Sequence, residues 1–282
     1  MTESSRLSRL NLFEVAEANC DSLQRRFGAA KAERAGSESQ SLQCFADRVA
    51  RDGRVAVNVR PHTLANLLKG ERLLNTYELV ERQAICAAKP VLDLLKERLG
   101  KYYTQRIAFD STFEDGERFR YGALNIGGPG AVDFGLFCCV LGSGFPASDS
   151  RLAYLMHDSL SEYVSPDGIV DVQSIGAQVA SQASCHYLAT IKHAGVIPIT
   201  PEGNWDHLLC SSEDYVEAIF VQDVTLQKIA EVRVSANEYR RVKDIAFASF
   251  GGESSDGQSA FARDFLKVLQ ASDQGTLRLR RV

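Results

Sequence analysis

Glu217 is one of two residues whose type and setting suggest chemistry. It stands in the stretch YVEAIFVQ (215–222), where apolar residues alternate on both sides of it. A carboxylate among apolar neighbours is costly unless it is paired or put to use. Such a group can stabilise positive charge that develops while a bond breaks. The alternative is a glutamate on an edge strand that points to solvent.

Arg60 is the second candidate, and it closes the stretch RVAVNVR before a Pro-His-Thr turn. The planar guanidinium suits phosphate oxygens, and the start of a following helix would add backbone donors. His62 in the same turn is a candidate ligand-binding or acid/base residue. The alternatives are a surface arginine paired with Glu71 or Glu81, and a turn histidine that faces solvent.

The elements that must position these residues are strands and short helices. Alternation in RVAVNVR places three valines on one face and Ala56, Asn58 and Arg60 on the other, which predicts a strand. Thr63 can cap a helix over LANLLKGERLL. Further strands are expected in YYTQRIAF, RYGALNI, DFGLFCCVL, YVEAIFVQ and IAEVRVS, and helices in QSIGAQVASQASCHYLATIKHAG and SAFARDFLKVLQ.

The organisation that follows has three parts. Residues 1–50 are expected to form a helical, partly flexible N-terminal extension in which AERAGSESQS is a linker. Residues 51–250 form the main domain, and residues 251–282 contain a helix and a basic tail. The fold class is α+β.

Composition excludes several classes of protein. The net charge of -4 argues against a sequence-independent grip on nucleic acid, and no run of 18 apolar residues predicts a membrane span. The seven cysteines include no CxxC pair, so neither a zinc site nor a redox dithiol is indicated, and no metal is expected. Unpaired thiols indicate a reducing compartment, either the cytoplasm of the producing cell or that of a host cell into which the protein is secreted.

Several of these stretches, in this order, resemble an uncharacterised bacterial family within the ADP-ribosyltransferase superfamily. The resemblance lies in RVAVNVRPHT, in RYGALNIGG with DFGLFCCVL, and in DYVEAIFVQ, with Tyr-Gly-Ala-Leu-Asn and Tyr-Val-Glu-Ala as its most specific islands. It spans about residues 55–235 as short islands. The resemblance implies split sheets and NAD as substrate.

The same resemblance implies roles for individual residues. Arg60 takes the position that holds NAD phosphate or ribose, with His62 beside it, and Glu217 takes that of the catalytic glutamate. Tyr121, Asn125 and Phe134 fall on matching strands, where aromatic rings flank the nicotinamide in relatives.

Two departures from the family pattern bear on activity. Leu136 stands where the family has a small polar residue, and TYELVERQ replaces a Ser-Asn-Gly stretch. Ser111 or Thr112 could supply the lost hydroxyl.

The resemblance implies a transferase that moves ADP-ribose from NAD to a protein target that the sequence does not name, or an NAD glycohydrolase. Relatives of this kind are often bacterial toxins or injected effectors. Alternatives are a catalytically inactive binding module with the same fold, favoured by the two departures, and a hydrolase that uses Cys185 or a histidine.

Overall fold

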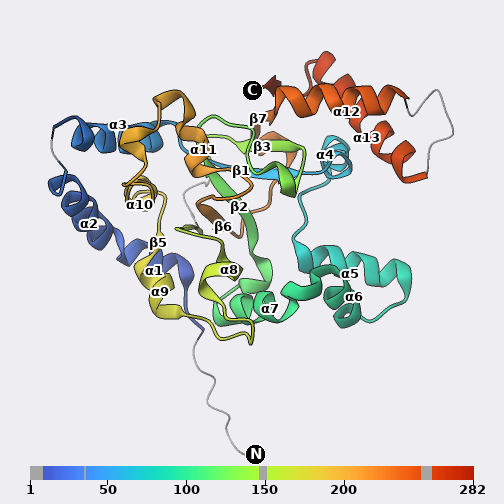
Figure 1. Ribbon diagram of the computed structural model, residues 1–282. Coiled ribbons are helices and arrows are strands. Elements are labelled where there is room, and N and C mark those ends of the chain that lie inside the picture. Colours follow the sequence, from blue (N-terminus) through green and yellow to red (C-terminus); the bar gives the residue numbers. More distant parts are fainter. Residues whose placement is uncertain (1–8, 35, 146–150, 249–255) are drawn as a thin grey trace, which may run out of the picture.

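The computed structural model describes residues 9–34, 36–145, 151–248 and 256–282. Its strands form one mixed sheet in the order β5-β4-β6-β2-β1-β3-β7-β8 (Figure 1). They are β1 (Arg54–Val59), β2 (Arg120–Asn125), β3 (Phe137–Leu141), β4 (Leu152–Leu155), β5 (Val179–Ala180), β6 (Glu217–Phe220), β7 (Ile229–Val234) and β8 (Leu279–Arg281). All neighbours are antiparallel except β7 and β8.

The helices are α1 (Leu12–Ala18), α2 (Cys20–Ala32), α3 (Gly36–Asp52), α4 (Pro61–Leu68), α5 (Thr76–Ala87), α6 (Val91–Leu99), α7 (Tyr103–Thr112), α8 (Ser159–Tyr163), α9 (Val172–Ala177), α10 (Cys185–Lys192), α11 (Trp205–Leu209), α12 (Ala236–Ala248) and α13 (Asp256–Asp273). The α+β class expected from the sequence is therefore confirmed. The strands belong to one continuous sheet, whereas the resemblance implied two.

The two faces of the sheet carry different side chains. We call face A the one that holds Ala56, Tyr121, Cys138 and Glu217, and face B the opposite one. Face B is apolar almost throughout, because the three valines of β1 and their neighbours pack under α2, α3, α4, α10, α12 and α13. On face A a second core under α1, α7, α8 and α9 covers only the half of the sheet around β4 and β6. The remainder of face A is where polar residues gather.

Both ends of the chain contribute to the face B core. Leu42 and Phe45 of α3 lie in it, and Phe45 meets the Trp205 ring edge-on at 5.3 Å. Near the other end, Phe265 of α13 stacks on Phe137 of β3 at 5.9 Å. The segment expected as a linker is largely helix, since α3 begins at Gly36. The polar start of the chain lies partly outside the described residues.

Two stretches fold differently from expectation. YYTQRIAF is the helix α7 and not a strand: Tyr103 and Ile107, four residues apart, pack against α5 and α6, and Phe109 packs on face A. Aromatic content suggested a strand, and tertiary contacts override that propensity. The helix expected over 173–195 is divided, because Val179 and Ala180 pair with β4 between α9 and α10.

Candidate functional site

Glu217 is the first residue of β6 and its side chain is buried on face A, only 3% exposed. Its Oε2 accepts a hydrogen bond of 2.8 Å from the backbone N–H of Ser159, the first residue of α8. Burial and the nearby carboxylate of Asp158 raise the pKa of Glu217 to about 8, against an opposing effect of Arg106. Glu217 is therefore mostly protonated at neutral pH.

Asp158 is a second carboxyl group close to Glu217, and its environment acts in the opposite direction. It caps α8 by accepting hydrogen bonds from the N–H groups of Leu160 and Ser161, and the Tyr215 hydroxyl also donates to it. Burial alone would raise its pKa, but these hydrogen bonds outweigh burial and lower it. Two interacting carboxyl groups whose pKa values are pushed apart are typical of acid/base sites.

Arg106 of α7 supplies the positive charge of this region, and its side chain is 13% exposed. The carbon at the centre of its guanidinium lies 3.8 Å from the centroid of the Tyr121 ring, and its Nη1 lies 3.6 Å from Asp110 Oδ1. Asp110 also accepts hydrogen bonds from the hydroxyls of Tyr121 and Tyr77, the second at 2.8 Å. We call Glu217, Asp158, Arg106, Asp110, Tyr121 and Tyr215 the Glu217 cluster.

An aromatic pair lies next to the carboxyl groups. The Phe134 ring is 59% exposed and meets the Tyr215 ring edge-on, with 5.8 Å between centroids. The Tyr215 backbone is fixed by Lys192, whose ammonium pairs with Asp214 and donates to the Tyr215 carbonyl at 2.7 Å. Through this pair, the solvent-accessible ring of Phe134 contacts Tyr215, whose hydroxyl donates a hydrogen bond to Asp158.

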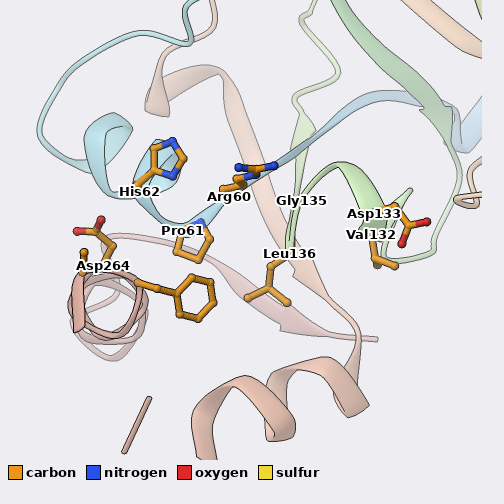
Figure 2. Close-up of a pocket in the computed structure, with 10 residues that line it drawn as sticks. Arg60, Pro61, His62, Val132, Asp133, Gly135, Leu136 and Asp264 are labelled. Carbon is orange, nitrogen blue, oxygen red and sulfur yellow. The ribbon is translucent and has the colours of Figure 1, made fainter. Parts of the chain in front are cut away.

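Arg60 lies in a different place, an open groove of about 600 Å³ shown in Figure 2. In that view His62 and Asp264 lie on one side of the groove, and Val132 and Asp133 on the other. We call this the Arg60 groove; its lining is Arg60, Pro61, His62, Val132, Asp133, Gly135, Leu136, Ala260, Phe261 and Asp264. Glu217 is not among the lining residues.

The strand register separates Arg60 from Glu217. Ala56, Ala123 and Glu217 lie level across β1, β2 and β6. Arg60 is four residues further along, about 13 Å, and β1 lies two strands from β6, about 10 Å. The structure therefore does not bring these two groups face to face.

The 127–136 loop, which includes the one-turn helix η3 (Val132–Phe134), lies between the two places. The Asn58 amide donates to the carbonyls of Pro129 and Gly135, and the Ala131 N–H donates to Asn58 Oδ1. At Gly135 a Cβ would overlap the Val59 backbone, so glycine allows the loop to lie flat on β1. One loop thus lines the Arg60 groove and presents Phe134 to Tyr215.

The remaining predicted site residues are spread over the molecule. His62 is exposed in the Arg60 groove, where its ring lies 3.2 Å from the Thr63 hydroxyl. Asn125 is buried and contacts Gly127, Gly128 and Arg233, so it shapes the loop. The hydroxyls of Ser111 and Thr112 both bond the Ala108 carbonyl of their own helix. Tyr121, through Arg106 and Asp110, belongs to the Glu217 cluster.

The thiol alternative finds no support in the structure. Cys185 is buried, and burial raises the pKa of its thiol to about 12, which disfavours the nucleophilic thiolate. Within the described ranges, no group of three or more His, Cys, Asp or Glu side chains could hold a metal ion. No helix in those ranges is long and apolar enough to cross a bilayer.

Sequence reasoning missed four members of the Glu217 cluster: Arg106, Asp110, Asp158 and Tyr215. Arg106 was missed because YYTQRIAF was expected to be a strand, and Asp110 directly precedes Ser111 and Thr112, which were considered only for their hydroxyls. Asp158 sits in His-Asp-Ser, which proximity in sequence alone does not mark as a site. Its position just before Ser-Leu-Ser-Glu is a helix-capping signal that could have placed it at a helix start.

Comparison of the chain with protein-family models, curated proteins and solved structures gives no match.

Proposed function

We propose that this chain binds NAD and breaks the bond between nicotinamide and ribose, transferring the ADP-ribosyl group to a macromolecule or to water. The observation that carries the proposal is the buried carboxyl of Glu217, which accepts a hydrogen bond from the Ser159 N–H directly after Asp158. The resemblance set out above, in which Glu217 takes the catalytic position, agrees with this choice.

The chemistry requires a group that stabilises positive charge at the ribose. When the C1′–N bond breaks, its electron pair passes to the nicotinamide nitrogen, and the pyridinium becomes neutral. Positive charge develops on the ribose, as in glycoside hydrolysis. A carboxylate beside the ribose stabilises that charge. The acceptor then attacks C1′ through oxygen or nitrogen and releases a proton.

Glu217 must lose its proton for this role, and the substrate favours that loss. The nicotinamide ring of NAD is a cation, and a cation near a carboxyl group favours its ionised form. Binding should therefore release a proton from a carboxyl whose pKa is about 8 in the free protein. Asp158, whose pKa is lowered, is the group suited to accept a proton from the attacking acceptor.

The aromatic pair offers a surface for the ring of the substrate. Phe134 presents its ring to solvent, and Tyr215 links that ring to Asp158. Offset or edge-on contacts between rings add about 0.5–1.5 kcal/mol beyond area burial. An entering nicotinamide would be held beside the carboxyl groups.

Turnover of NAD by the purified protein tests the proposal. We expect Glu217→Gln to reduce turnover by roughly 100-fold or more, the usual effect of removing a group that stabilises a transition state. Glu213→Gln is the matched control, because Glu213 is exposed and lies four residues earlier. Absence of turnover by the wild type, or equal turnover by Glu217→Gln, would reject the assignment.

Transfer to a macromolecule is tested separately. With NAD labelled in the adenosine part and a cell lysate, label on protein that depends on Glu217 supports a transferase and the toxin or effector role. Release of free ADP-ribose alone supports a glycohydrolase.

A binding module without catalysis is the second candidate. It is favoured by the separation of Arg60 from Glu217 and by Leu136, which lines the Arg60 groove. Calorimetric titration separates the two: heat of NAD binding without release of nicotinamide supports the module, and cleavage excludes it.

A further inference from the structure

Arg106 has a side chain that is only 13% exposed and a donor that is left unpaired. The two arginines that are fully buried in the described ranges are both paired: Arg120 with Glu78 and Asp223, and Arg233 with Glu231 and Asn125. Arg106 Nη1 is buried and has no hydrogen-bond partner among the described residues, although Asp110 Oδ1 lies 3.6 Å from it.

The position of Arg106 is set by its own contacts with Tyr121 and Asp110 and by the hydrogen bonds of the preceding residue, Gln105. Its guanidinium covers the Tyr121 ring on β2, and Asp110 lies one turn further along α7. Gln105, the preceding residue, donates to the carbonyls of Leu160 and Val164 and so ties α7 to α8. The first N–H of α8, that of Ser159, donates a hydrogen bond to Glu217. Both α7 and Glu217 are therefore bonded to the same short helix.

Among the groups that interact with the Glu217 carboxyl, Arg106 is the one that carries positive charge. These groups are Asp158 and the backbone of Ser159 at the start of α8, Arg106 of α7, the Tyr121 hydroxyl of β2, and the hydroxyl of Tyr215, which precedes β6. Tyr163 of α8 also interacts with Glu217 electrostatically. The register places Arg106 near Glu217: its guanidinium covers the Tyr121 ring, and Tyr121 is the diagonal neighbour of Glu217 on face A, because Tyr121 pairs with Ile219 and Ala123 pairs with Glu217. Asp158 favours the neutral form of the Glu217 carboxyl, and Arg106 is the cation that favours its ionised form.

We propose that Arg106, in place of Arg60, is the arginine that serves Glu217: a positioning residue that favours the ionised form of this carboxyl and holds the Tyr121 ring beside it. The role in catalysis rests on the function proposed above. The effect on Glu217 does not, and it can be measured in the free protein.

The test is titration of the Glu217 carboxyl by carbon NMR in protein labelled at the glutamate carboxyl carbons. The resonance is assigned by its loss in Glu217→Gln. We expect Arg106→Gln to raise the pKa of Glu217 by about 1 unit or more, since an opposite charge at close range shifts a carboxyl by 1–3 units. Arg106→Lys, which keeps the charge, should shift it much less.

Asp110→Asn is the matched control, because it weakens the same hydrogen-bond network and keeps the cation. We expect no rise in the pKa of Glu217 in this variant. A rise equal to that in Arg106→Gln would show that loosened packing is the cause and would overturn the proposal, as would an unchanged pKa in Arg106→Gln. If Arg106→Gln does not fold, the double variant Arg106→Gln/Asp110→Asn is titrated in its place. It removes both charges of the pair, so neither charge is left without its partner.

The pH profile of NAD cleavage gives the second measurement. In Arg106→Gln, the part of this profile that reports ionisation of Glu217 should move to higher pH. The shift should equal the change in the pKa of Glu217 measured by NMR. A shifted carboxyl in a protein that does not cleave NAD would leave the electrostatic role standing and reject the proposed function. Cleavage of NAD together with an unchanged pKa of Glu217 in Arg106→Gln would support the proposed function and reject the electrostatic role of Arg106.

Discussion

The Glu217 cluster and the Arg60 groove are the two polar regions that flank the 127–136 loop, and they are built in opposite ways. In the cluster, charged groups are buried and meet one another: Asp110 is 2% exposed and Glu217 3%. In the groove, Arg60 and His62 are exposed, and the Arg60 side chain forms no hydrogen bond or ion pair with any described residue. A buried charge must be matched by its surroundings, whereas an exposed one is matched by water. The cluster is therefore the region whose chemistry the fold controls.

The largest expected effect comes from Asp110→Ala. This change leaves the Arg106 cation without its carboxylate and two tyrosine hydroxyls without an acceptor. Breaking one partner of a buried pair costs about 3–5 kcal/mol in the free energy of unfolding. Urea denaturation measures the loss. A cost near that of a surface substitution would mean that the cluster is as well hydrated as the groove.

Glu217→Gln should change how stability depends on pH. The folded state holds the Glu217 proton up to a pKa of about 8, and the unfolded state loses it near 4.5. Between these values the unfolded chain binds fewer protons, so the wild type loses stability as pH rises. Full stability is present below pH 4.5, and the loss is complete above about pH 8.

Urea unfolding at pH 5 and pH 8 measures this dependence. Since glutamine does not titrate, the free energy of unfolding of Glu217→Gln should improve relative to the wild type between the two pH values. Parallel behaviour of both proteins would mean that Glu217 is ionised when folded.

Phe134→Ala should act on ligand binding more than on stability. Its ring is 59% exposed, so little burial is lost on truncation, and the contact with Tyr215 accounts for about 0.5–1.5 kcal/mol. If the pair receives the nicotinamide, affinity for NAD should fall roughly 10-fold, which is 1.4 kcal/mol. Calorimetric titration checks this, and unchanged affinity would remove the aromatic pair from the binding site.

Arg60→Ala should have the smallest effect on folding. Surface substitutions away from special features usually change stability by no more than about 0.5 kcal/mol. If NAD phosphate extends into the Arg60 groove, the KM for NAD rises while kcat stays close to the wild-type value. A large fall in kcat would show that Arg60 reaches the reacting atoms, and it would erase the distinction between the two regions.

For β1 and β6, the sequence by itself determined the strand and the direction of its side chains. Alternation in RVAVNVR and YVEAIFVQ placed Val55, Val57 and Val59 on one face and Glu217 with Ile219 on one face, and the structure agrees. It determined this much because side-chain direction in a strand follows from the two-residue repeat alone. The same rule placed Cys138 and Cys139 on opposite faces.

Only the tertiary structure decided what surrounds Glu217. Register set Glu217 level with Ala56 and not with Arg60, and register depends on which strands pair. Arg106 and Asp110 became neighbours of Tyr121 because α7, a stretch with the composition of a strand, folds as a helix and packs on α5, α6 and face A. The charge environment of a carboxyl is a sum over such long-range contacts, so no local pattern in the sequence contains it.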